Sequence, residues 1–272
     1  MELFAYTGGK PSDPARPAIV FIHGAQHDHS VWILQSRYLA HHGYGVLAFD
    51  LPGHGRSEGP ACESVEACAD AVAGELDARG VGHALLVGHS MGSLIALEVA
   101  RRRPAVAGVA LLATAFPMNV SDALLAATRD DPAAAIDMIN LWSHSAGIAP
   151  FSAHPSNPGP GFNIMWQSLR LMQRIERAHG TQTLVRDFAA CNAYSGGLTA
   201  AAALTCPVLF VLAEADQMTP PKAARGLVEA VTAPKEIVTL AATGHAMMSE
   251  NPDGVREALR LFAQRTFATA SV

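Results

Sequence analysis

The sequence predicts an α/β fold in which a mostly parallel sheet, flanked by helices on both faces, carries an all-helical insertion. Two observations lead to this prediction. Short apolar runs of strand length alternate with longer segments of helical spacing, which is typical of a parallel sheet buried on both faces. The alternation stops near residue 116 and resumes near residue 201, with no convincing strand in between.

The expected strands are short apolar runs that end at turn residues. They cover residues 3–7, 18–22, 45–49, 84–87, 106–113, 207–213 and 236–240. The expected helices cover residues 30–42, 63–79, 90–103, 131–144, 162–178, 181–194, 220–231 and 251–267. Asp131 and Pro132 form a typical helix start, with a capping side chain followed by proline at the first helical position. We therefore assign residues 1–115 and 201–272 to an α/β core and residues 116–200 to a helical cap.

Composition limits the classes of function. Half of the 272 residues are hydrophobic and 16% are charged, which suits a large buried core. The formal net charge is -5 and there is no long basic run, so neither nucleic acid nor a membrane surface is an expected partner. The start lacks the features of a signal peptide, and the most apolar run, residues 106–116, is too short to span a bilayer.

The four cysteines form no C-x-x-C pair and no zinc-finger spacing. We interpret them as free thiols and expect a cytoplasmic protein without a metal or organic cofactor. The sequence gives no sign of the oligomeric state.

The strongest chemical signal is the motif Gly88-His-Ser-Met-Gly92, placed between an expected strand and an expected helix. A sharp strand-to-helix turn there would expose the Ser90 hydroxyl, and the helix N-terminus would favour a developing negative charge. Ser90 is therefore the candidate nucleophile.

A serine nucleophile needs a base that a third group orients. Of the twelve histidines, His245 directly follows the last expected strand, so it lies at the sheet edge where Ser90 also emerges. Asp216 follows the strand at residues 207–213 and can fix the tautomer of His245, whereas Glu214 lies nearer the strand and is the weaker candidate. The stretch that Asp50 begins is interpreted as a structural turn.

A histidine-glycine pair, His23-Gly24, ends the second expected strand. The small Gly24 would allow the backbone to approach a substrate closely. We expect the backbone N–H groups of Ala25 and Met91 to form the oxyanion hole.

Together these motifs resemble the α/β-hydrolase superfamily, in particular its cap-bearing members with a histidine-glycine oxyanion loop. The resemblance covers nearly the whole chain: the H-G loop, the D-x-x-G-x-G-x-S stretch at residues 50–57, the serine motif, the acid loop and the G-H loop occur in family order. It implies a twisted, mostly parallel sheet of about eight strands with a helical lid. The chain departs from the family in offering one strand before the H-G strand and in having Ser93 where many relatives have glycine.

The resemblance favours a carboxylesterase acting on small or medium esters through an acyl-enzyme. Dehalogenases and epoxide hydrolases use aspartate in place of Ser90. Carbon-carbon-bond hydrolases commonly have tryptophan after the catalytic histidine, where this chain has Ala246. A carbon-carbon-bond hydrolase and a cofactor-free perhydrolase remain alternatives, as does a non-catalytic ligand-binding protein of the same fold.

The cap is expected to select the substrate, a small apolar or moderately polar ester-like molecule. Five aromatic or apolar side chains are candidates for lining the cleft: Trp32, Trp142, Phe162, Met165 and Trp166.

Overall fold

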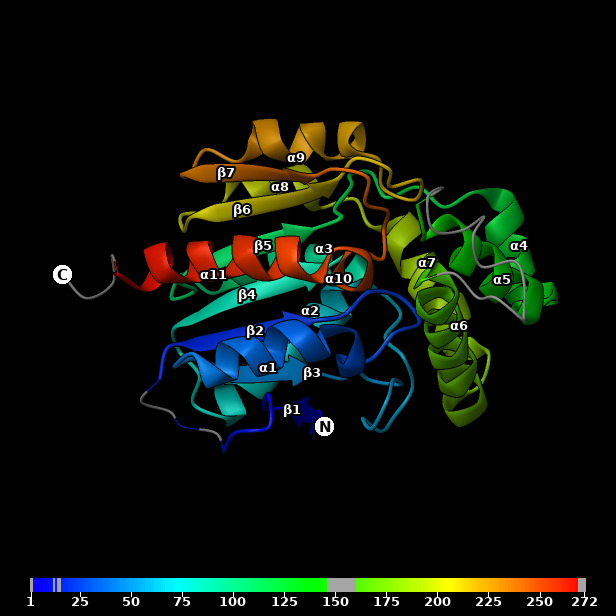
Figure 1. The fold of residues 1–272 in the computed structure, drawn as a ribbon, viewed down its shortest axis with the longest axis horizontal. Coiled ribbons are helices and arrows are strands. Elements are labelled where there is room, and N and C mark those ends of the chain that lie inside the picture. Colours follow the sequence, from blue (N-terminus) through cyan, green and yellow to red (C-terminus); the bar gives the residue numbers. More distant parts are fainter. Residues whose placement is uncertain (1, 12, 14–15, 146–159, 269–272) are drawn as a thin grey trace.

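The computed structural model describes residues 2–11, 13, 16–145 and 160–268 and places seven strands in one sheet. The strand order is β1-β3-β2-β4-β5-β6-β7, and every neighbouring pair is parallel except β1 with β3 (Figure 1). The strands are β1 Ala5–Tyr6, β2 Ala18–Ile22, β3 Gly45–Phe49, β4 Ala84–His89, β5 Gly108–Leu112, β6 Val208–Ala213 and β7 Lys235–Leu240. The predicted mostly parallel α/β fold is therefore confirmed, with seven strands where the resemblance implied about eight.

Helices cover both faces of this sheet. The described helices, including those that lie beyond the sheet, are α1 Ile33–His41, α2 Val65–Ala78, α3 Met91–Arg102, α4 Asp122–Asp130, α5 Pro132–Trp142, α6 Pro160–His179, α7 Gln182–Ala193, α8 Gly197–Ala202, α9 Arg225–Ala230, α10 Met247–Glu250 and α11 Pro252–Ala268, with short 3-10 turns η1 His29–Trp32 and η3 Pro221–Ala224. One buried cluster joins α2, α3, α8 and α9 to the sheet, and a second joins α1, α10 and α11 to the opposite face.

Strand periodicity divides the core between these two layers. Along β2, Val20 and Ile22 pack in the first cluster, whereas Ile19 and Phe21 pack in the second. All four side chains are fully buried, as expected for a central parallel strand. This explains why the strand is a continuous apolar run in the sequence.

Five helices of the described chain, α4 to α8, come between β5 and β6, and we call the first four, α4 to α7, the cap helices. Figure 1 shows them grouped beyond the carboxyl ends of the strands. They have a hydrophobic cluster of their own, centred on Ile136, Ile139 and Met172. Helix α8 spans the boundary that we placed between residues 200 and 201, and it packs against α3 of the core.

Helix α4 was not among the expected helices. Its N-cap is Ser121, whose side chain accepts a hydrogen bond from the Leu124 N–H. Only Leu124 and Thr128 of this nine-residue helix are buried, so it offers few apolar positions from which a sequence pattern could be recognised. In the part of the chain that the structure describes, no helix combines the length and apolarity that a membrane span requires.

Two glycines determine how closely β4, α3 and β2 pack. A methyl group on Gly88 would overlap the carbonyl of Gly92, and one on Gly92 would overlap the carbonyls of Ile22 and His23. The helix can therefore start directly against β2 only because both positions lack a side chain.

We predict that Gly92→Ala lowers the free energy of unfolding by about 1–3 kcal/mol or prevents folding, because the added methyl group meets rigid backbone. The matched control is Gly74→Ala within α2, where an added methyl group meets nothing within 4 Å. That substitution should raise stability by up to about 1 kcal/mol through helix propensity. Urea unfolding followed by circular dichroism measures both, and equal stabilities of the two variants would contradict the close-packing argument.

Candidate active site

The turn between β4 and α3 holds Ser90 in a strained backbone conformation. Its φ is 54° and its ψ is -122°, in the region that residues other than glycine rarely adopt. The Ser90 N–H donates to the carbonyl of Leu112, 2.9 Å away, and its carbonyl accepts from the N–H of Ser93 at 2.8 Å. The Ser93 hydroxyl lies 2.6 Å from the same carbonyl and 2.8 Å from the hydroxyl of Thr114. Ser93, the departure from the family pattern, thus supports the turn that exposes Ser90.

The loop after β6 brings Asp216 to His245. The two side chains are joined by a 2.9 Å contact between His245 Nδ1 and Asp216 Oδ2. Asp216 Oδ1 accepts the backbone N–H groups of Met218 and Thr219 at 2.9 and 2.8 Å. Burial alone would raise the pKa of Asp216, but the charge of His245 and these hydrogen bonds outweigh it and lower the pKa to about 2. The carboxylate therefore stays ionised and leaves Nε2 of His245 free to act as a base.

Two further side chains, which sequence reasoning did not identify, hold His245 in place. The Thr219 hydroxyl lies 2.7 Å from Asp216 Oδ2 and 3.1 Å from His245 Nδ1. The His89 ring donates through Nε2 to the carbonyl of His245 at 2.9 Å, and burial lowers the pKa of His89 well below its usual value. A neutral His89 thus fixes the backbone of the loop that carries His245. In the sequence, the only indication of a role for His89 in the site was its position directly before Ser90.

A cavity of about 210 Å³ connects these groups. Ser90, His245 and Ala25 line it, so the structure brings the candidate nucleophile, base and one oxyanion residue to one space. Apolar atoms make up the larger part of the lining surface, and the large apolar side chains are Met118, Val120, Leu124, Ile139, Trp142, Phe188 and Met218. Met91 is buried, and its N–H is the first of α3, where helix geometry leaves it without an acceptor within the helix.

Gly24 lines the same cavity and also lies directly against the turn that carries Ser90. A methyl group there would lie 3.1 Å from His89 Nδ1 and 3.2 Å from Cβ of Ser90. The close approach at Gly24 is therefore to the strained turn itself. It places the Ala25 loop directly beside the nucleophile.

The loop that carries Ala25 is anchored to the cap helices by Asp187 of α7. The Gln26 N–H donates to Asp187 Oδ2 at 2.7 Å, and the Gln26 side chain donates to the carbonyl of Met172 at 3.2 Å. The same carboxylate oxygen lies 2.9 Å from Nε2 of His54. Asp187 and His54 are 2% and 1% exposed, so the cap and the core share a buried ion pair directly behind the candidate oxyanion hole.

The family assignment follows from comparison of the whole chain. Residues 19–258 match the family model described as the alpha/beta hydrolase family. The chain belongs to this family. The match begins in β2 and ends in α11, so it includes every loop that contributes to the candidate site of this alpha/beta hydrolase.

Individual relatives match this chain over only part of its length or at low sequence identity. The lipase LipV of Mycobacterium tuberculosis is 38% identical over 125 residues, which cover 43% of this chain and 46% of the lipase. The chain spans about half the length of such curated relatives in these matches. The putative carbamate hydrolase RutD of Klebsiella pneumoniae is 25% identical over 91% of both chains. A solved structure, the enol-lactonase from Burkholderia xenovorans LB400, aligns over 96% of both chains with a TM-score of 0.82 at 21% identity, a likeness of fold.

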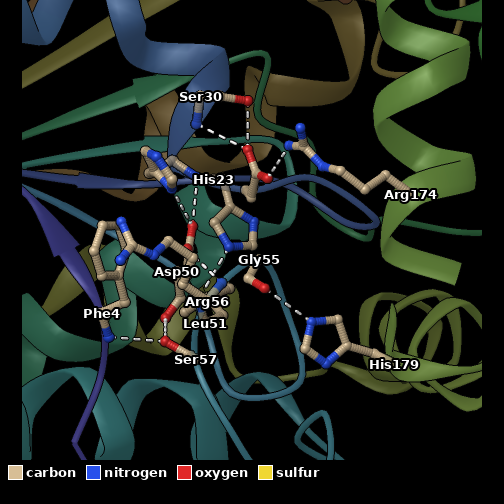
Figure 2. Close-up of polar contacts among 12 residues, drawn as sticks. Phe4, His23, Ser30, Asp50, Leu51, Gly55, Arg56, Ser57, Arg174 and His179 are labelled. Atoms are coloured by element: carbon tan, nitrogen blue, oxygen red, sulfur yellow. Dashed lines mark hydrogen bonds and ion pairs between the residues drawn. The ribbon is translucent and has the colours of Figure 1, made fainter. Parts of the chain in front are cut away.

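The loop after β3 in this alpha/beta hydrolase forms the structural turn expected for residues 50–57. Figure 2 shows Asp50 accepting the N–H of Arg56, while the Ser57 hydroxyl bridges the Asp50 carbonyl and the Phe4 N–H. A methyl group on Gly55 would overlap the Asp50 carboxylate, which explains the glycine. Ser57 thus connects this turn to Phe4, which directly precedes β1.

Two contacts from α6 reach the same region of the core (Figure 2). Arg174 donates to Asp28 at 2.6 Å, and His179 Nε2 lies 3.1 Å from the carbonyl of Gly55. Asp28, His29 and Asp50 also form a group whose potential metal-ligand atoms lie within 4.8 Å of one another. Arg174, Ser30 and backbone N–H groups already use these carboxylates, so the group serves the turn and the cap contact.

The predicted cap residues have different locations. Trp142 lines the cavity with Ser90, and Trp166 lines a second cavity described below. Met165 is partly buried and lines neither of these cavities, and the side chain of Phe162 lies outside the described part of the structure. Trp32 is fully buried, and its ring centroid lies 5.1 Å from that of Phe21 of β2 at a tilt of 42°, because Trp32 ends the short turn η1 facing the sheet. The structure therefore does not bring Trp32 to the cleft.

The Asp187–His54 pair predicts a pH-dependent contribution to stability. Burial alone would lower the pKa of His54, but the charge of Asp187 and their hydrogen bond raise it above 6.5. The resulting stabilisation is fully present below the unfolded pKa of about 6.5 and is lost as pH rises through the folded pKa. We expect His54→Gln to cost roughly 3 kcal/mol at pH 6 and less at pH 9.

Urea unfolding of the wild type, His54→Gln, Asp187→Asn and the double variant at both pH values provides a mutant cycle. The coupling energy between the two positions should decrease from pH 6 to pH 9. A coupling energy that does not change with pH would show that the pair is not ionised as inferred.

Proposed function

We propose that the protein is a serine hydrolase that cleaves small or medium esters through an acyl-enzyme. The observation that carries the proposal is that Asp216 contacts His245, which lines one cavity together with Ser90. A carboxylate that holds the imidazole tautomer, a base, and a serine on a strained turn are the three parts that acyl transfer by serine requires.

In the proposed reaction, Ser90 Oγ attacks the ester carbonyl while Nε2 of His245 takes its proton. The N–H groups of Ala25 and Met91 donate to the oxyanion of the tetrahedral intermediate. His245 then gives the proton to the leaving alkoxide, which departs as an alcohol and leaves Ser90 acylated. Water, deprotonated by His245, attacks the acyl carbon; the bond to Ser90 Oγ then breaks, the acid is released, and His245 returns the proton to Ser90 Oγ. We expect substrate binding to bring Ser90 Oγ within hydrogen-bond distance of His245 Nε2.

The size and lining of the first cavity support a small acyl group. Its volume of about 210 Å³ lies below the roughly 300–1,000 Å³ typical of drug-sized ligand sites. Because its lining is mostly apolar, we infer that it takes the acyl chain. The names of the lipase and the enol-lactonase among the similar proteins agree with ester-type chemistry.

A fluorophosphonate probe tests the nucleophile directly. We expect one adduct, located on Ser90 by peptide mass spectrometry, and none in Ser90→Ala. Asp216→Asn should retain the fold and lose about 10³- to 10⁴-fold in kcat, because the imidazole tautomer is no longer fixed. A folded protein that is not labelled would refute the proposed nucleophile.

A series of p-nitrophenyl esters tests the acyl cavity. We expect kcat/KM to rise from acetate to butyrate or hexanoate and to fall for chains of twelve or more carbons, which exceed the cavity. The matched control is Ser90→Ala, which should show only the uncatalysed rate with every ester. Equal rates for the wild type and this control would assign the activity to a contaminant.

A further inference from the structure

A second cavity of about 490 Å³ is also lined by His245 but not by Ser90. It shares four lining residues with the first cavity, namely His27, His89, Ser143 and His245, but Ser90 and Ala25 line only the first. One wall is α6 of the cap, and the other consists of η1, the start of α1 and the loop after His245. Both cavities therefore meet at the candidate general base.

The charge of the second cavity is one-sided. Arg170, Arg174 and Arg177 line it, and its described lining residues include no aspartate or glutamate. The three arginines lie at spacings of four and three along α6, so they share one face of the helix and span about 10 Å. This concentration of positive charge occurs in a chain whose formal net charge is -5.

Two of these guanidinium groups have no carboxylate partner among the described residues. Arg174 pairs with Asp28, but Arg170 donates to the side chain of Gln173, and Arg177 donates to the Gln173 carbonyl. Both arginines are exposed and retain donors for a ligand. Unpaired guanidinium groups beside an open cavity suit a carboxylate or a phosphate, which they can bind with two parallel hydrogen bonds.

Apolar side chains extend along the same cavity. Leu34, Trp166 and Ile33 line it and are 54%, 52% and 38% exposed, among the most exposed large hydrophobic residues described. An alkyl or aryl segment can contact these side chains while its charged end contacts the arginines. The ligand chemistry is thus an apolar chain that ends in an anion.

The reaction chemistry decides which part of an ester would occupy this space. The general acid must give its proton to the leaving oxygen, so the alcohol lies on the side of His245. The acyl carbon must bond to Ser90 next to the oxyanion donors, which places the acyl chain in the first cavity. We propose that the second cavity binds the leaving alcohol and that Arg170 and Arg177 recognise an anionic group carried by that alcohol. This inference rests on the proposed function.

Matched esters test this proposal. The neutral reference is the butyryl ester of 6-hydroxyhexanamide, and the anionic substrates are the butyryl esters of 6-hydroxyhexanoate and of 1,6-hexanediol monophosphate. The ester bond lies far enough from the varied group to keep its intrinsic reactivity the same. The two anionic substrates distinguish a carboxylate from a phosphate preference.

The measured quantity is kcat/KM for each anionic ester divided by that for the amide ester. We expect wild-type ratios above one. Arg170→Gln and Arg177→Gln should each lower the ratio about threefold, and the double variant about tenfold. Higher salt should lower the wild-type ratio. The matched control is Arg129→Gln on α4, an exposed cap arginine that lines neither cavity, and its ratio should equal that of the wild type.

A double variant with wild-type ratios for both anionic esters would overturn the proposal, since the arginines would then be only a solvated helix face. The amide ester separates this failure from that of the proposed function, because its Ser90-dependent hydrolysis needs no arginine contact. A ligand-observed NMR titration of Ser90→Ala with 6-hydroxyhexanoate and 6-hydroxyhexanamide tests the anion site without turnover. We expect the acid to bind more tightly than the amide, and we expect this difference to disappear when both arginines are replaced in the Ser90→Ala background. Equal affinities of Ser90→Ala for the two ligands would overturn the proposal.

Discussion

The close passage of α3 over β2 is the constraint on which the site depends. Gly88 and Gly92 allow the backbone at the start of α3 to contact the carbonyls at the end of β2. That contact forces Ser90 into its positive φ and brings Gly24 beside it. The candidate nucleophile and both expected oxyanion donors therefore lie at this one packing contact between α3 and the end of β2.

Histidines connect this contact to the rest of the site, and their protonation states differ because their surroundings differ. Burial lowers the pKa of His23 to about 4, so the neutral ring accepts the Leu51 N–H and donates to Gly24. A buried carboxylate has the opposite effect on His54, only 4.9 Å from His23 between ring centroids. The neutral ring of His23 thus fixes loops of the core, whereas the raised pKa of His54 supports its ion pair with Asp187 of the cap.

Much of the fold and the candidate site could be predicted because the necessary signals are local. Buried parallel strands are continuous apolar runs, and loops at their carboxyl ends must meet at one edge, which is why Ser90, Asp216 and His245 could be selected together. Asp187 and Thr219 could not be selected, because their roles come from partners that the sequence pattern does not identify. Trp32 was misplaced for a related reason: composition alone does not show whether an aromatic ring at the start of a helix faces the sheet or the cleft.

The anchoring of the cap also bears on how such a protein can diversify. Asp187 holds the backbone next to Ala25, and Arg174 holds Asp28 in the same loop. The helices expected to select the substrate and the loop expected to stabilise the oxyanion are therefore not separate modules. New specificity can arise by replacing side chains on the cleft-facing side of α6, but exchanging the whole insertion with that of a relative would also remove the anchors of the core loop.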